Sequence, residues 1–122
     1  MQPELFDVIE LLVDLPEHAL RSGARGAIVL CHPDGACEVE FTTEEGETVA
    51  LCPLSADQFI IVWRAKTRTW LPIAEQLAAV IAHLPEEVRR EVLDFARFLH
   101  ERRQRRQIGT ATDASQCSTN PS

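Results

Sequence analysis

Alternating apolar and polar residues mark the first half of the chain as β-strand. The clearest case is residues 37–41, CEVEF, where the odd positions are apolar and Glu38 and Glu40 occupy the even ones. This alternation is typical of an antiparallel strand with one face in the core and the other in solvent. The sequence therefore predicts a strand whose exposed face carries carboxylates.

Four other short apolar runs are separated from this one by turn or loop residues. They span residues 5–13, 26–31, 48–54 and 59–63. Pro53 cannot donate a hydrogen bond to a neighbouring strand, so the run that contains it should be short or lie at a sheet edge. Ser55 can cap a single helical turn before the last run. Five strands in about 60 residues predict a small, five-stranded, SH3-like antiparallel β-barrel.

From Pro72 the apolar period becomes helical. Pro72 can open a first helix, whose apolar face is formed by Ile73, Leu77, Val80, Ile81 and Leu84. A second helix is predicted from Pro85, with acids in its first turn and arginines near its end, as the helix dipole favours.

The second helix carries an apolar stripe of four residues spaced i, i+4, i+7 and i+11: Val88, Val92, Phe95 and Leu99. The stripe is too long for one short partner helix to cover. We therefore expect part of it to pack against the barrel or a second copy of the chain.

The predicted class is α+β, and four segments follow in order. Residues 1–63 form the barrel, 64–71 a basic linker, 72–107 a two-helix hairpin, and 108–122 a small, polar tail that we expect to be disordered. No apolar run is long enough to span a membrane, and the N-terminus lacks the features of a signal peptide. The expected location is the cytoplasm.

Charge divides the chain in the same way. Residues 1–63 hold twelve acids and two bases, net −10, whereas residues 64–107 hold ten bases and six acids, net +4. The exposed acids Glu38, Glu40, Glu44 and Glu45 are therefore candidates for steering a basic protein partner.

Candidate chemistry is sparse. Cys31, His32 and Cys37 are the best candidate for a metal site, because thiolate and imidazole suit zinc. Cys31 and His32, however, should face opposite sides of one strand, and cysteines are common core residues. We expect no catalytic group, cofactor or metal.

Two arginine clusters suggest a different function. Arg21 and Arg25 flank a G-x-x-G loop ahead of a strand, as in KOW-type barrels that bind RNA or ribosomes, and the run 102–106 contains Arg102, Arg103, Arg105 and Arg106. The surrounding acids would repel a polyanion, so tight-turn glycines and arginines paired with nearby acids are the favoured interpretation. A KOW-like binding module stays open as the alternative.

The motifs DVIELLVDLPEHALRSGARGAIV, PDG, EVEF, GET and LSADQ occur in this order in residues 5–63. In this order they resemble the small bacterial family called domain of unknown function 4926. The resemblance implies a short SH3-like barrel and transfers no catalytic residue.

The motif VLDFARFL, preceded by a short helix and the dipeptide Leu84-Pro85, lies within residues 72–103. This arrangement resembles the family called domain of unknown function 2281. Its members are similar to antitoxin components of bacterial toxin–antitoxin pairs. Together with the charge division, this resemblance implies a non-catalytic interaction module that binds a basic protein partner, such as a toxin. The apolar stripe makes a homodimer through the last helix a further expectation.

Overall fold

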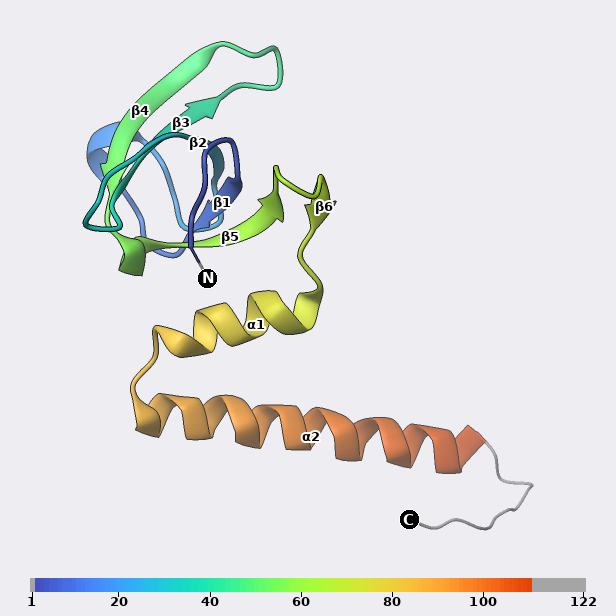
Figure 1. Ribbon diagram of the computed structural model, residues 1–122. Helices are drawn as coiled ribbons and strands as arrows, with labels where there is room; N and C mark the ends of the chain where they lie inside the picture. The colour runs from blue at the N-terminus through green and yellow to red at the C-terminus, as the bar shows by residue number, and fades with distance from the viewer. Residues whose placement is uncertain (1, 111–122) are drawn as a thin grey trace. The chain divides into compact units, whose positions relative to one another are not determined.

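The computed structural model describes residues 2–110, with side chains up to Arg106. Figure 1 shows an α+β chain in which an antiparallel sheet precedes two helices. The strands are β1 (Val8–Leu11), β2 (Arg25–Cys31), β3 (Cys37–Thr42), β4 (Thr48–Leu54), β5 (Phe59–Arg64) and β6 (Thr69–Trp70), and the helices are η1 (Pro16–His18), η2 (Ala56–Gln58), α1 (Ile73–Ala82) and α2 (Glu86–Thr110).

The sheet has six strands and is open, so the prediction of a closed five-stranded barrel was wrong on both points. Its order is β4-β3-β2-β1-β5-β6. The sixth strand forms because Thr69 and Trp70 turn back onto Arg64 and Trp63. Strands β4 and β6 are therefore the two edges, and no pairing joins them in the described part of the chain. Pro53 lies on edge strand β4, as its missing N–H requires.

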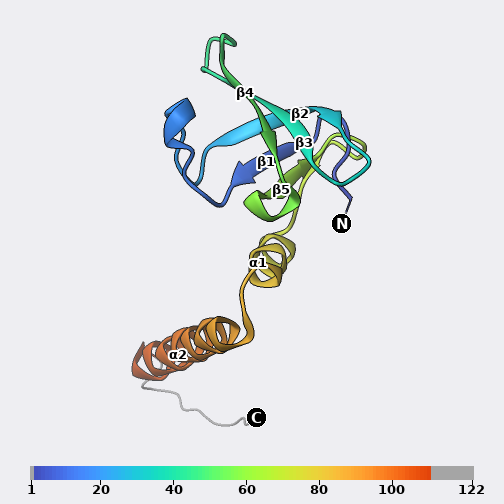
Figure 2. The same ribbon diagram turned by 90° about the vertical axis from the view of Figure 1, so that its left-hand side faces the viewer.

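One core cluster lies on the inner face of the sheet. It contains Ile9, Leu11, Leu15, Ile28, Cys37, Val39, Phe41, Cys52, Leu54, Phe59 and Ile61. Residues of β4 and β5 share this cluster although three strands separate them in the sheet. The sheet must therefore curl, as both ribbon views show (Figures 1 and 2).

Gly23 and Gly26 have different roles. Gly23 has a φ of +97°, which provides the backbone freedom expected before β2. Gly26 instead lies in β2, where a Cβ would come within 2.7 Å of Val39 Cγ1 and 2.9 Å of the Glu40 carbonyl oxygen. The tight-turn interpretation of the G-x-x-G loop therefore holds for Gly23 but was wrong for Gly26, which allows β2 and β3 to approach closely.

A buried ion pair joins the N-terminal segment to the end of β5. The carboxylate of Asp7 is fully buried and accepts hydrogen bonds from Arg64 Nη1 at 2.6 Å and from the backbone N–H groups of Ala65 and Glu4. Each of its two oxygens therefore has a partner, which offsets the cost of removing the charge from water.

Strand β5 is buried on both faces. Phe59 and Ile61 belong to the core cluster, whereas the alternate residues Ile60 and Val62 lie outside it and are nevertheless buried. Helix α1 packs against β5, and both ribbon views place the helix beside that strand (Figures 1 and 2). A strand covered on both faces has the continuous apolar run that FIIV displays.

The contacts divide the chain into two units, residues 1–83 and 84–122. Helix α1 belongs with the sheet, and α2 is the described element of the second unit. Helix α2 ends at Thr110, three residues beyond the predicted end of the hairpin. The rest of the predicted tail, residues 111–122, lies outside the described residues.

None of the helices in the described range is both long enough and apolar enough to cross a membrane.

Candidate functional site

The solvent side of β2, β3 and β4 carries a mixed surface, which we call the outer face: Leu30, Glu38, Glu40, Val49 and Leu51. Leu30 lies opposite Glu38, and Glu40 lies opposite Leu51 in the cross-strand register. Leu30 is 50% exposed and Leu51 is 57% exposed. The sequence correctly predicted the two acids on this side but did not single out the leucines beside them.

Both acids of the outer face are held by neighbours. Glu38 Oε2 lies 3.1 Å from His32 Nε2, and Glu40 accepts a hydrogen bond from the Thr48 hydroxyl. Glu44 and Glu45 lie in the turn between β3 and β4 and are exposed. The four predicted acids thus lie on β3 and in the turn that follows it, and Glu38 and Glu40 each contact a neighbouring side chain.

The two arginines before and at the start of β2 differ in their contacts. Arg25 Nε donates to Glu10 Oε1 at 3.3 Å, and its guanidinium lies 5.3 Å from the centre of the Trp70 ring. Arg21 is exposed. Arg25 is therefore paired with an acid, as the tight-turn interpretation expected.

Cys31, His32 and Cys37 do not form a metal site. Cys31 and Cys37 are cross-strand partners whose sulfur atoms lie 4.0 Å apart, but the His32 ring binds Glu38 on the other side of the sheet. Within residues 2–110 no group of three or more metal-ligating side chains comes together. Cys37 and Cys52 are core residues, as predicted, whereas Cys31 is exposed.

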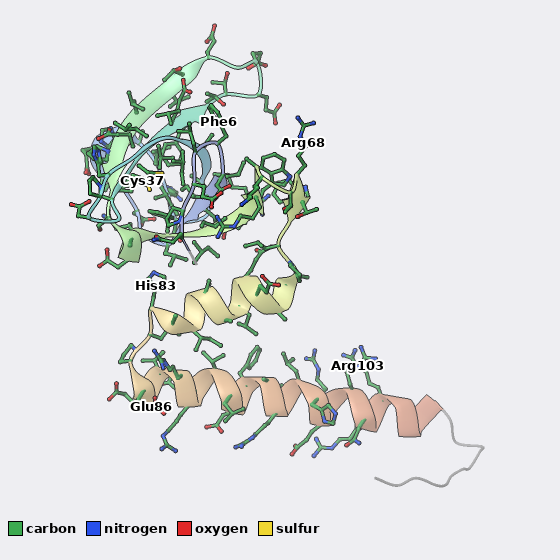
Figure 3. All side chains as sticks on the ribbon, in the orientation of Figure 1. Phe6, Cys37, Arg68, His83, Glu86 and Arg103 are labelled. Atoms are coloured by element: carbon green, nitrogen blue, oxygen red, sulfur yellow. The ribbon has the colours of Figure 1, made fainter. Side chains whose placement is uncertain are left out.

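A cleft of ≈ 500 Å³ lies between α1 and the sheet. Its apolar lining comes from Phe59, Ile60 and Ile61 of β5, Leu71, and the alanines of α1, and Glu75 and His83 also contribute. The His83 ring spans the end of the cleft, because Nδ1 lies 2.8 Å from the Ala79 carbonyl oxygen and Nε2 lies 3.1 Å from that of Ala56 (Figure 3). The helical pattern did not predict this cleft, because the alanines that line it do not form an apolar face of large residues.

The large apolar residues of α1 lie away from this cleft. Ala78, Ala79 and Ala82 line the cleft, whereas Ile73, on the opposite side of the helix, is 82% exposed. Leu77, one turn along from Ile73, is also exposed. The predicted apolar face of this helix is therefore not the face that packs on β5.

The predicted stripe on α2 is present and only partly covered. Val88, Val92 and Leu99 are half-buried, and Phe95 is 61% exposed. Phe98, which the stripe did not include, stacks on Phe95 with ring centres 6.2 Å apart. The exposed apolar surface of α2 is thus wider than a single i, i+4 line.

The four arginines near the end of α2 are exposed. The Arg102 guanidinium lies 5.8 Å from the centre of the Phe98 ring, and Arg105 Nη2 lies 3.8 Å from Glu101 Oε1. At least two of these four cations therefore have contacts within their own helix.

The comparison with known families divides the chain as the motifs do. Residues 5–61 match the family described as Domain of unknown function (DUF4926). Residues 76–116 match the family described as Protein of unknown function (DUF2281). Both resemblances noted in the sequence are confirmed. The chain matches no curated protein and no solved structure.

Proposed function

We propose that the protein is a non-catalytic interaction module that binds a basic protein partner through the outer face. The observation that carries this proposal is the register of Leu30 opposite Glu38 and of Leu51 opposite Glu40. Exposed leucines provide apolar area to bury, and the adjacent carboxylates select a partner with lysines or arginines.

The charge of the first half of the chain supports a basic partner. Residues 1–63 have a net charge of −10, and Arg25, one of their two bases, is already paired with Glu10. A field of one sign raises the association rate with an oppositely charged protein and weakens as salt is added.

The resemblance of residues 76–116 to the second family adds an antitoxin-like role to the proposal. In this role the sheet binds the toxin, and the apolar stripe of α2 pairs two copies of the chain. We also propose that the sheet is an open, six-stranded relative of the SH3-like class, because its curl brings β4 and β5 to one core.

Co-expression with the product of the adjacent open reading frame tests the partner. We expect the neighbour to be toxic alone, to be neutralised by this protein, and to co-purify with it in a salt-sensitive complex. A neighbour that is neither toxic nor bound contradicts the antitoxin role.

Substitutions then test the surface. Leu51→Ser on the outer face should weaken binding by roughly tenfold or more, because an apolar contact at the centre of an interface is lost. Leu5→Ser is the matched control, since Leu5 is comparably exposed but lies outside the outer face. Equal affinities for both variants would contradict binding through this face.

A second candidate, a KOW-like RNA- or ribosome-associated module, would use Arg21, Arg25 and the exposed arginines of α2. Arg102, Arg103, Arg105 and Arg106 lie within five residues of one helix and can contact phosphate. A gel shift with structured RNA at low salt tests this function. Absence of a shift removes it, whereas a shift lost in the fourfold alanine variant supports it.

A further inference from the structure

Two cysteines face each other at the end of the β2–β3 hairpin. Cys31 is the last residue of β2, Cys37 is the first of β3, and they are direct cross-strand partners. Their sulfur atoms lie 4.0 Å apart. Directly opposed residues of antiparallel strands have Cα atoms about 4.5–5.5 Å apart, which is within the range that a disulfide spans.

The two thiols differ in access. Cys31 is exposed, and its thiol is directed at the carbonyl oxygen of Pro3 at 3.7 Å. Cys37 lies within the curled sheet (Figure 3). It belongs to the core and is only 1% exposed. Burial, followed by the proximity of Cys31 and of the acids Asp34 and Asp7, raises the pKa of the Cys37 thiol to about 11. A reagent in solution therefore reaches Cys31 first and finds Cys37 protonated.

We propose that Cys31 and Cys37 form a site of reversible oxidation by hydroperoxides, in which Cys31 reacts with the oxidant and Cys37 closes a disulfide. The site is separate from the outer face, and it does not depend on the proposed interaction function.

The chemistry balances with a peroxide as the oxidant. The Cys31 thiol gives its proton to solvent, and the thiolate attacks one peroxide oxygen. The O–O bond breaks, the sulfur becomes a sulfenic acid, and the hydroxide that leaves takes up a proton to become water. The Cys37 sulfur then loses its proton and attacks Cys31 Sγ, the S–O bond breaks, and a second water leaves. Two thiols are oxidised to one disulfide, and hydrogen peroxide is reduced to two waters.

Cys52, the third cysteine in the described part of the chain, is not placed to form a disulfide in the same way. Cys52 lies on β4 opposite Val39 and is buried, so it has neither a cysteine as its cross-strand partner nor access to solvent. Cys52→Ser is therefore the matched control for Cys31→Ser.

The experiment treats reduced full-length protein carrying Cys117→Ser with one equivalent of hydrogen peroxide and counts thiols after unfolding. We expect two of the three remaining thiols to be lost, with a mass lower by two hydrogens, and to be restored by a phosphine reductant. Cleavage before Asp34 and after Glu38 separates Cys31, Cys37 and Cys52 into different peptides, so the bond can be assigned.

The variants decide the proposal. Cys52→Ser should still form the disulfide, Cys31→Ser should lose no thiol under these conditions, and Cys37→Ser should stop at a sulfenic acid that dimedone traps. Because Cys31 is exposed, its serine variant should fold even where the Cys37 variant does not. A sulfinic acid at Cys31 without a disulfide, or a disulfide between two chains as the main product, would overturn the proposal.

Discussion

Asp7 is the buried charged residue of the described part of the chain. Its fully buried carboxylate binds Arg64, which is itself mostly buried, and two backbone N–H groups. Replacing Asp7 by Ala leaves a guanidinium and these N–H groups without their acceptor. We expect the free energy of unfolding to fall by about 3–5 kcal/mol, measured by urea denaturation.

The matched control is the Arg25–Glu10 pair, whose arginine is half exposed. Glu10→Gln should cost only about 0–1 kcal/mol, because water screens an exposed pair. Similar losses of stability for Asp7→Ala and Glu10→Gln would contradict the prediction that the buried pair stabilises the protein more than the exposed pair does.

Cys37 gives the native state a pH dependence above neutrality. Its pKa is raised from 9.0 to about 11, chiefly by burial. Between pH 9 and pH 11 the Cys37 thiol is deprotonated in the unfolded chain but protonated in the native state. The free energy of unfolding is therefore highest below about pH 9 and falls as the pH rises towards 11. One pKa unit corresponds to about 1.4 kcal/mol, so the full fall should be about 3 kcal/mol, of which about 2 kcal/mol lies between pH 8.5 and pH 10.5.

Urea denaturation at pH 8.5 and 10.5, under reducing conditions, measures this fall. The chain has no tyrosine and only one lysine, Lys66, which limits the contribution of groups other than thiols in this window. Cys37→Ala should remove most of this pH dependence of stability. Burial also raises the pKa of the Cys52 thiol, which accounts for the pH dependence that remains. An unchanged slope in Cys37→Ala would refute the assignment.

Periodicity predicted the strands whose residues alternate and could not predict a strand that is defined by pairing alone. Strand β3 alternates over six residues, whereas β6 has two residues and exists only because they pair with Trp63 and Arg64. The acids of the outer face were found because alternation assigns a side to each residue. The cleft was missed because alanines facing a strand leave no amphipathic signal.

Helix α1 has ten residues, too few to be stable alone, so its contacts with β5 must hold it. His83, which caps the end of α1, adds a contact with η2, because its Nε2 lies 3.1 Å from the Ala56 carbonyl oxygen. His83→Ala should destabilise the first unit by about 1 kcal/mol and increase hydrogen exchange in α1 selectively. His100→Ala on α2 is the control, and equal exchange in both variants would exclude a role for His83 in docking.

For the whole molecule, the division at His83 predicts which truncation the sheet tolerates. A chain of residues 1–83 keeps α1 on β5, and its free energy of unfolding should lie within about 1 kcal/mol of that of the full-length protein. A chain of residues 1–71 loses α1 and uncovers apolar surface around Ile60. Because burying one such side chain contributes about 1.5–3 kcal/mol, this shorter chain should lose at least that much stability.

Thermal and urea unfolding of the two truncated chains can be monitored by circular dichroism. These measurements distinguish a unit that includes α1 from an organisation in which α1 and α2 form a separate helical unit. If α1 were only part of a helical hairpin, residues 1–71 would be as stable as residues 1–83. Equal stability would contradict the assignment of α1 to the sheet. The assignment predicts that residues 1–83 are much more stable than residues 1–71 and about as stable as the full-length protein. Residues 1–83 would then be the smallest stable part in which the outer face can be tested for binding, because Leu51 and Glu40 need only the intact sheet.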